Sequence, residues 1–343
     1  MKAAVFYGKN DLRVEERNIP EIGRNDVLVR VHACGICGTD VHIFCGDEGA
    51  APTPENTVLG HEFAGEVVKV GTDVKSAALG DKVCVDPNKL CGSCDFCRRG
   101  IGHFCTDITG IGTTVDGGFA EYCAVPASQV YKVADSLSFE QAAMTEPVSC
   151  CLHGIELCNI KCGDTVMVIG CGMIGLIMLQ LARLSGAANI IVIEPIKEKR
   201  KQALKLGADT ALDPKADNIT DALKKHGLEQ ADVVIECVGR PETIEQAIAL
   251  AGKYSTVMMF GLTKPDAEIS VKPFEIFKKE ITLKSSYINP YTFPAAIKLI
   301  ESGKLDVSSM IYKTEPLTEL PSILSDGKRR GAGKYIITML GTV

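Results

Sequence analysis

The sequence has no excess of positive charge and no segment typical of an export signal. Its 343 residues carry a formal net charge of −6, and its isoelectric point is near 5.6. A chain with this charge has no electrostatic basis for binding nucleic acid or an anionic membrane, so we expect its partners to be small molecules or copies of itself. The first ten residues are too short and too polar for a signal peptide, which predicts a cytoplasmic protein.

Internal repeats, low-complexity tracts and long linkers are also absent. One stretch, residues 165–182, carries no charge, but it contains three glycines and is followed at once by Arg183, which argues against a transmembrane helix. The fifteen cysteines would suggest disulfides in a small secreted protein, but this chain is not small and has no signal. Reduced thiols and metal ligands are therefore the better interpretation.

Residues 165–194 predict a strand, a glycine turn, a helix and a second strand. Gly170 permits the tight bend, Gly172 lets the backbone approach a pyrophosphate, and Gly175 allows the helix to pack closely on the strand. The helix start offers its N–H groups and the positive end of its dipole to that pyrophosphate. Glu194 ends the second strand, where a carboxylate binds an adenosine ribose and repels a 2′-phosphate, so NAD is favoured over NADP. The plain alternative is a structural unit that binds no nucleotide.

Two patterns of secondary structure divide the chain. Residues 1–150 alternate short β-rich runs with glycine and proline turns, which predicts a partly closed antiparallel β-barrel. Residues 151–288 alternate strands with helices, which predicts a doubly wound parallel sheet of the α/β class. Residues 289–343 hold one helix, at 294–302, and one strand, Tyr335–Thr338, and are too few for a domain. We therefore expect them to complete the barrel, with the nucleotide-binding domain as an insertion.

A run of four cysteines is the strongest metal signal in the sequence. Cys91, Cys94 and Cys97 are separated by gaps of two residues, and a gap of seven residues separates Cys97 from Cys105. Two-residue gaps let successive thiolates converge on one tetrahedral ion, and four thiolates close its coordination sphere, as in a structural zinc site. The bacterial ferredoxin pattern has a shorter last gap and a following proline, so an iron–sulfur cluster is not expected.

A second set of candidate ligands is dispersed along the chain. Cys37, His61, Glu62 and Glu146 together offer sulfur, nitrogen and oxygen, and such mixed ligation with an open position is what catalytic zinc requires. Each of these residues taken alone is more often a core residue than a ligand. The prediction rests on their joint occurrence in a chain that also carries a nucleotide-binding pattern.

The motifs Cys37-Gly-Thr39-Asp40 and Gly60-His61-Glu62, the four-cysteine run and the glycine turn occur in this order. In that order they resemble the zinc-dependent medium-chain alcohol dehydrogenases, and the resemblance covers essentially the whole chain. It implies a GroES-like catalytic domain at 1–150 and 289–343, a Rossmann NAD-binding domain at 151–288, and two zinc ions in each chain. One zinc would be catalytic and the other structural.

The pair Glu146-Pro147, where other branches carry a cysteine, is similar to the polyol (sorbitol) dehydrogenase branch. This similarity implies catalytic zinc on Cys37, His61 and Glu62, with Glu146 bound directly or through water. Two carboxylates bound to the zinc would make the site more anionic and weaken the Lewis acid. We therefore expect either Glu62 or Glu146 to lie farther from the zinc or to bind it through water. Cys150 and Cys151 are the alternative third ligands.

The resemblance also implies roles for residues outside the metal sites. The positions that match the family's contacts with NAD are Ile174, Gly239, Gly261 and Leu262. Lys199 could contact the same ribose as Glu194, or could belong to a solvated helix face. Thr39 and His42 match a hydroxyl and an imidazole that pass the alcohol proton to solvent.

The implied reaction is the reversible transfer of a hydride between a secondary alcohol and NAD, which gives a ketone or ketose. Ile288 and Asn289 stand where animal sorbitol dehydrogenases carry arginine and tyrosine, so another sugar alcohol, with or without a phosphate, is favoured over sorbitol. Asn289 and Tyr291 either line the substrate pocket or are ordinary turn residues.

Two alternative functions remain open. The first is an L-threonine or short-diol dehydrogenase, and the second is a zinc-stabilised, non-catalytic NAD-binding redox sensor. Relatives are commonly homodimers or homotetramers.

Overall fold

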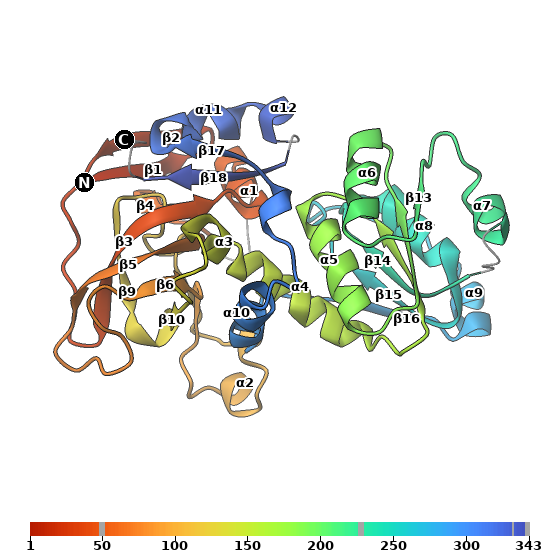
Figure 1. The fold of residues 1–343 in the computed structure, drawn as a ribbon, viewed down its shortest axis with the longest axis horizontal. Coiled ribbons are helices and arrows are strands. Elements are labelled where there is room, and N and C mark those ends of the chain that lie inside the picture. The colour runs from red at the N-terminus through yellow and green to blue at the C-terminus, as the bar shows by residue number, and fades with distance from the viewer. Residues whose placement is uncertain (48–51, 226–229, 331–332, 340–343) are drawn as a thin grey trace. The chain divides into compact units, whose positions relative to one another are not determined.

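The computed structural model describes residues 1–47, 52–225, 230–330 and 333–339. The chain forms two compact units (Figure 1). The first, which we call the barrel unit, comprises Met1–Ser149 and Asn289–Val343, and the second, the nucleotide unit, comprises Cys150–Ile288. The chain therefore leaves the barrel unit once and returns to it once.

The main sheet of the barrel unit has the strand order β10-β6-β5-β3-β18-β17, with β9 paired to β3. A three-stranded sheet, β2-β1-β4, and a short ribbon, β7-β8, complete the unit. The strands are β1 (Lys2–Gly8), β2 (Asp11–Glu16), β3 (Asp26–Gly35), β4 (Thr57–Val58), β5 (Glu62–Val70), β6 (Lys82–Val85), β7 (Asn88–Lys89), β8 (Thr109–Gly110), β9 (Tyr122–Pro126), β10 (Val130–Lys132), β17 (Ile311–Pro316) and β18 (Lys334–Thr338).

The strands that residues 289–343 add to the barrel include one parallel pair. Strands β17 and β18 run parallel, whereas β18 pairs with β3 in the antiparallel sense. Parallel neighbours need a crossover connection rather than a hairpin. Here the connection contains α11 (Leu320–Ser325) and α12 (Gly327–Arg330), and Leu320, Ile323 and Leu324 bury it against the barrel core.

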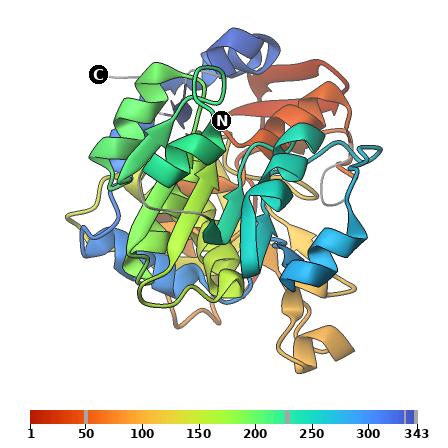
Figure 2. The same ribbon diagram turned by 90° about the vertical axis from the view of Figure 1, so that its right-hand side faces the viewer.

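The nucleotide unit is built on six parallel strands in the order β13-β12-β11-β14-β15-β16 (Figure 2, where they run from yellow-green to blue). This order reverses direction beside β11, which makes the sheet doubly wound as expected. The strands are β11 (Thr165–Ile169), β12 (Asn189–Ile193), β13 (Thr210–Leu212), β14 (Ala231–Glu236), β15 (Ala251–Met259) and β16 (Thr282–Ser285).

The charge-free stretch that follows residue 164 is split between β11 and α5. All five residues of β11 are buried, as in a strand covered on both faces, and α5 buries eight consecutive residues, Gly175–Ala182. In the described part of the chain, no helix has the length and hydropathy needed to cross a membrane. The apolar character of this stretch therefore comes from a strand in the middle of the sheet and from the buried helix that contacts it.

The remaining helices have the following bounds. They are α1 (Gly38–Cys45), α2 (Asp95–Arg98), α3 (Phe139–Ala143), α4 (Thr145–Cys158), α5 (Met173–Leu184), α6 (Lys197–Lys205), α7 (Ile219–Lys225), α8 (Pro241–Leu250), α9 (Pro273–Lys279) and α10 (Phe293–Glu301). The helix expected at 294–302 is thus present one residue earlier.

A buried polar cluster in the barrel unit surrounds the points where the chain leaves and re-enters it. The Asp86 carboxylate accepts hydrogen bonds from the Asn88 backbone N–H at 3.1 Å and from Asn289 Nδ2 at 3.2 Å. Thr292 Oγ1 donates to the backbone oxygen of Ser149 at 2.8 Å. Asn289 therefore has a structural place in this cluster. Burial raises the pKa of Asp86 to about 6, although both hydrogen bonds oppose the shift.

The raised pKa of Asp86 makes a prediction for stability. The folded state binds this proton more tightly than an unfolded chain, whose aspartate has a pKa near 3.8, so stability falls as pH rises from about 4 to about 6. Above that window the buried charge costs about 3 kcal/mol, from roughly two pKa units. We expect Asp86→Asn, which keeps an acceptor oxygen, to be more stable than the parent at pH 7.5 in urea unfolding, with a smaller difference at pH 5. The exposed Asp107→Asn should show no such trend, and a difference independent of pH would contradict the assignment.

Candidate functional site

The glycine turn after β11 has the geometry of a nucleotide-binding turn. Gly170 has φ of +91°, which favours glycine, and a side chain at Gly175 would overlap the carbonyl oxygen of Gly170. Gly172 is the N-cap of α5 and has no side-chain cap, and a Cβ on it would meet nothing within 4 Å. The start of α5 therefore faces open space with uncapped backbone, which is what an incoming phosphate requires.

Glu194 follows β12 and is 5% exposed. Its Oε2 accepts from the Cys171 backbone N–H at 2.9 Å, and its Oε1 accepts from that of Ile196 at 2.9 Å. The carboxylate is thus fixed to the glycine turn, and its remaining lone pairs can still accept from a ribose hydroxyl. Lys199 is half-buried on α6. Its neighbour Arg200, which sequence reasoning did not select, donates to the Glu194 carbonyl oxygen at 2.6 Å.

The loop after β14 is organised by a residue that sequence reasoning missed. Glu236 is fully buried and accepts from the backbone N–H groups of Val238 at 2.7 Å and Gly239 at 3.0 Å. A side chain on Gly239 would overlap the carbonyl oxygen of Leu262, so glycine is needed where these two loops meet. A Cβ on Gly261 would likewise overlap the backbone nitrogen of Gly239. Of the other predicted contacts with NAD, Leu262 is 64% exposed and Ile174 is half-buried on α5.

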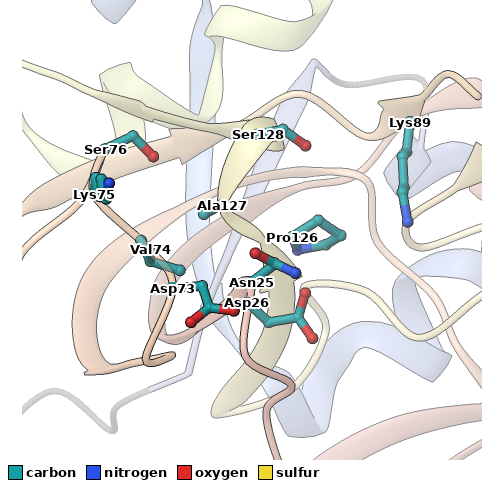
Figure 3. Close-up of a pocket in the computed structure, with 10 residues that line it drawn as sticks. All are labelled: Asn25, Asp26, Asp73, Val74, Lys75, Ser76, Lys89, Pro126, Ala127 and Ser128. Carbon is teal, nitrogen blue, oxygen red and sulfur yellow. The ribbon is translucent and has the colours of Figure 1, made fainter. Parts of the chain in front are cut away.

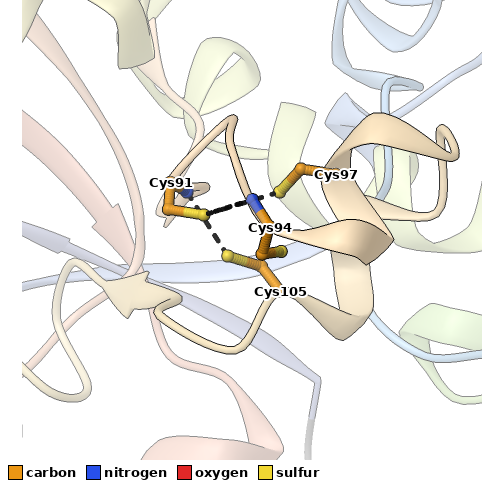
Figure 4. Close-up of side chains that lie close together, drawn as sticks. All are labelled: Cys91, Cys94, Cys97 and Cys105. Atoms are coloured by element: carbon orange, nitrogen blue, oxygen red, sulfur yellow. Dashed lines mark hydrogen bonds between the residues drawn. The ribbon is translucent and has the colours of Figure 1, made fainter.

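The four cysteines of the predicted structural site converge in the segment around α2. Their sulfur atoms all lie within 4.8 Å of one another, with 4.0 Å between the Sγ atoms of Cys91 and Cys97 (Figure 4). The segment, which we call the cysteine lobe, extends away from the main sheet in both views of the fold (Figures 1 and 2). Four thiols at this separation form a donor set that fits tetrahedral zinc.

Backbone N–H groups donate hydrogen bonds to two of the four sulfur atoms in the lobe. Ser93 and Cys94 donate to Cys91 Sγ at 3.4 and 3.3 Å, and these bonds lower the pKa of Cys91 to about 6. The Cys91 N–H donates in turn to Cys105 Sγ at 3.3 Å, and that of Asp107 at 3.4 Å. Hydrogen bonds to sulfur stabilise the charged form, which is the form that binds metal.

A second group in the barrel unit brings together Cys37, His61 and Glu62. One possible ligand atom from each lies within 4.8 Å of those from the other two. Cys37 is the N-cap of α1, and His61 and Glu62 lie at the start of β5, after Gly60, whose φ of +97° turns the chain. Sulfur from one segment and imidazole and carboxylate from another form a set that fits a catalytic zinc with an open position.

Asp40 is a fully buried carboxylate beside this group. Its Oδ2 accepts from the Cys37 backbone N–H at 2.8 Å, and its Oδ1 lies 3.5 Å from Nδ1 of His61. Burial opposes a charged imidazole, but Asp40 and Cys37 outweigh it and raise the pKa of His61 well above its usual value. The Asp40 carboxylate thus faces one ring nitrogen of His61, which is the place that carboxylates take beside metal-binding histidines. The sequence placed Asp40 in a motif without assigning it this contact.

Glu62 also has a cationic partner that the sequence did not indicate. Lys334, on the last strand β18, is 3% exposed and forms an ion pair with Glu62 Oε2. Burial disfavours the ammonium, but Glu62 raises the pKa of Lys334 above its usual value. The other carboxylate oxygen, Glu62 Oε1, is buried and has no hydrogen-bond partner among the described residues. An orphaned buried oxygen next to a thiol and an imidazole fits a metal ligand.

The remaining predicted residues lie at the edge of this group. Thr39 Oγ1 is 3.7 Å from Cys37 Sγ, and His42 Nδ1 is 3.0 Å from Oδ2 of Asp47, a partner not foreseen. Glu146 is buried in the first turn of α4 and is not a member of the three-residue group. The alternative ligands Cys150 and Cys151 belong to the nucleotide unit.

Two other features of the barrel unit do not join the site. Tyr291 is 59% exposed, with φ of +62°. A cavity of about 370 Å³ is lined by residues near the start of β3 and the ends of β5, β7 and β9 (Figure 3). Its carboxylates are already engaged, because Asp26 accepts from the Gly23 N–H at 3.0 Å and Asp73 pairs with Arg24 at 2.9 Å. None of the predicted ligands lines this cavity.

Comparisons with known proteins agree with this geometry. Residues 23–135 match the alcohol dehydrogenase GroES-like domain, and residues 174–302 match the zinc-binding dehydrogenase family. The chain is 34% identical over 324 residues to D-arabinitol dehydrogenase 1 of Uromyces fabae, with 92% of each protein covered. It is 35% identical over 321 residues to an L-threonine 3-dehydrogenase of Caldanaerobacter subterraneus subsp. tengcongensis, with 91% of each covered.

A solved structure gives the same picture. The chain superimposes on a zinc-binding dehydrogenase from Sinorhizobium meliloti 1021, crystallised with NADP, with a TM-score of 0.94 and 37% sequence identity. The match covers 98% of this chain and 99% of that one. The fold expected from the sequence, a GroES-like barrel with an inserted Rossmann domain, is confirmed.

Proposed function

Since this chain belongs to the zinc-dependent medium-chain alcohol dehydrogenase family, we propose that it oxidises a polyol, with or without a phosphate, to a ketose and reduces NAD. The family makes it a zinc-containing, NAD(P)-dependent enzyme that acts on CH–OH groups. The choice of a polyol and of NAD goes beyond what the family membership settles. A non-catalytic redox sensor is set aside, because a sensor would need none of Cys37, His61 and Thr39.

The observation that carries the proposal is the convergence of Cys37, His61 and Glu62 in the barrel unit. In our proposal these three residues hold the catalytic zinc, and Glu146 stays back or binds through water. His61 would use the ring nitrogen that does not face Asp40. A zinc ion there would supply a Lewis acid that lowers the pKa of a substrate hydroxyl from roughly 16 towards 7.

Residues of α1 provide a route for the alcohol proton in this proposal. Thr39 is near the metal group, through its 3.7 Å contact with Cys37 Sγ, and His42 lies one helical turn later on the same face. The His42 imidazole is part-exposed and held by Asp47, so it can pass a proton to solvent and be restored.

The nucleotide unit would hold the dinucleotide through the glycine turn. Gly172 and the start of α5 would receive the pyrophosphate, and Glu194 would bind the adenosine ribose. Gly239, Gly261, Leu262, Ile174 and Lys199 stay as proposed contacts. The fixed carboxylate of Glu194 supports NAD because a 2′-phosphate there would meet a negative charge. The NADP bound to the Sinorhizobium meliloti relative is the reason to test both cofactors.

L-threonine, or a short diol, is the second candidate substrate. The 35% identity to an L-threonine 3-dehydrogenase and the run Cys37-Gly-Thr-Asp-Val-His-Ile43 support it. Glu146, where an aspartate is common in that group, supports the polyol instead. The similarity to a D-arabinitol dehydrogenase points the same way.

One panel separates these candidates. We would follow absorbance of reduced cofactor with sorbitol, xylitol, arabitol, their phosphates, 2,3-butanediol and L-threonine, each with NAD and with NADP. We expect the highest kcat/KM with a polyol or its phosphate and NAD. A higher kcat/KM with threonine or butanediol would overturn the polyol assignment, and a preference for NADP would overturn the role of Glu194.

The two cysteine-containing groups predict the metal content. We expect two zinc ions per chain by elemental analysis of the purified enzyme. Cys94→Ser should reduce this to about one and lower the thermal midpoint by roughly 5 to 10 °C, because the lobe loses a closed tetrahedral site. The exposed Cys162→Ser should keep both ions and the parent midpoint. Two ions in Cys94→Ser would contradict the assignment of the lobe.

We also propose that the enzyme is a homodimer or homotetramer. The negative net charge argues against nucleic acid and anionic membranes as partners, so other copies of the chain are the simplest macromolecular partners. Light scattering of the zinc-loaded enzyme distinguishes these states from a monomer.

A further inference from the structure

The buried ion pair between Lys334 and Glu62 has no role in the reaction described so far. Lys334 Nζ has two acceptors, Glu62 Oε2 and the carbonyl oxygen of Ile36 at 2.8 Å. Glu62 is fully buried and Lys334 is 3% exposed. A buried ion pair is weak evidence for stability, because removing two charges from water costs about as much as their attraction returns. A pair in this position therefore calls for another explanation.

Strand β3 leaves space for the ion pair between Lys334 and Glu62 at Gly35. Gly35 lies between the two charged residues in the sheet, since it is opposite Glu62 in the β3·β5 pairing and opposite Ile336 in the β3·β18 pairing. A Cβ on Gly35 would overlap Glu62 Oε2 and come within 2.8 Å of the Lys334 side chain. The absence of a side chain at Gly35 thus lets an ammonium from the last strand reach a carboxylate at the start of β5.

The two oxygens of Glu62 are in different surroundings. Oε2 is engaged by Lys334, whereas Oε1 is buried without a hydrogen-bond partner among the described residues. The carboxylate belongs to the same group as Cys37 and His61. If both oxygens were free, a carboxylate in this place could occupy two positions of a metal ion, because carboxylates bind as one-oxygen or two-oxygen ligands.

We propose that Lys334 is a positioning residue that restricts Glu62 to one oxygen in the metal site. This inference rests on the proposed catalytic zinc at Cys37, His61 and Glu62. By holding Oε2, Lys334 keeps one coordination position open for the substrate hydroxyl. Its charge also offsets that of Glu62, so that the thiolate, the carboxylate, the ammonium and a divalent ion sum to +1 rather than zero, which preserves Lewis acidity.

The test uses cobalt in place of zinc, because the visible spectrum of Co²⁺ reports its coordination number directly. Four-coordinate Co²⁺ absorbs strongly, and addition of a fifth or sixth ligand weakens and shifts the bands. In full-length enzyme that keeps zinc in the cysteine lobe and carries Co²⁺ at the Cys37 group, we expect Lys334→Met to show the weaker bands of higher coordination. Its kcat should fall about tenfold to a hundredfold with a smaller change in KM, the range for partners of metal ligands. Lys284→Met is the matched control, because Lys284 Nζ also donates to a backbone carbonyl oxygen, that of Leu157 at 2.7 Å, and both residues belong to the nucleotide unit.

A double variant separates positioning from folding. In a Glu62→Gln background the second oxygen is no longer a charged ligand, so adding Lys334→Met should leave the cobalt spectrum unchanged. Lys334→Arg keeps the charge, and we expect it to retain the parent spectrum even where Lys334→Met fails to fold. A parent-like spectrum and kcat in folded Lys334→Met, or an altered spectrum in Lys334→Arg, would overturn the inference. If the parent bound no cobalt at the Cys37 group, the proposed function itself would fail instead.

Discussion

Cys37→Ser is expected to reduce kcat/KM at least about a thousandfold while NADH still binds, because the catalytic metal supplies most of the acidification of the substrate hydroxyl. Serine is nearly isosteric with cysteine but is a poor zinc ligand at neutral pH. The thiol is the N-cap of α1, and its backbone N–H is held by Asp40 at 2.8 Å whether or not the sulfur is present. We therefore expect α1 to stay in place and the loss to concern the metal.

Elemental analysis and NADH fluorescence titration check this result. The variant should contain about one zinc per chain, in the cysteine lobe, and should bind NADH within about twofold of the parent. Cys45→Ser, at the other end of α1, is the matched control and should keep both zinc ions and the parent kcat. Full activity in Cys37→Ser would remove the chemical centre of the proposal.

Gly172→Ala and Gly175→Ala are expected to weaken NADH binding for different reasons. A Cβ on Gly172 meets nothing within 4 Å, so folding should be unaffected, but the methyl group would stand where the pyrophosphate approaches the backbone. We expect a loss of at least about tenfold in NADH affinity with an unchanged free energy of unfolding. A Cβ on Gly175 overlaps the carbonyl oxygen of Gly170, and backbone has to move to accept it.

For Gly175→Ala we expect a loss of about 2 kcal/mol or more in the free energy of unfolding, in addition to weaker NADH binding. Urea unfolding and NADH titration of the two variants distinguish the two effects. Normal NADH affinity in Gly172→Ala would show that the pyrophosphate lies elsewhere. Parent stability in Gly175→Ala would contradict the close packing of α5 on the turn.

The features read correctly from the sequence are those set by neighbours along the chain. The glycine turn needs only Gly170 to Gly175 and the buried strand before it, so its geometry follows from local backbone demands. The cysteine lobe is equally local, since 15 residues, from Cys91 to Cys105, carry all four sulfur atoms. Alternation of strands and helices also sufficed for the doubly wound sheet.

The features that the sequence did not indicate depend on contacts between distant segments. Lys334 and Glu62 are separated by 272 residues, and a single lysine near the end of a chain carries no signal of its partner. The parallel pairing of β17 with β18 was not predicted from the sequence for a similar reason, because the two short helices between these strands were not recognised. Glu236 reads as the last residue of an apolar strand, and only the fold shows that its carboxylate binds the loop that follows.

Strand β18 also has a consequence for the order of events during synthesis. It lies between β3 and β17 in the main sheet, yet it is translated after the whole nucleotide unit. The nucleotide unit is one continuous segment and can fold on the ribosome, whereas the barrel has a vacant slot until residues 334–338 have left the exit tunnel. The ammonium that faces Glu62 is part of that strand, so the metal centre is completed only after the whole nucleotide unit has been synthesised.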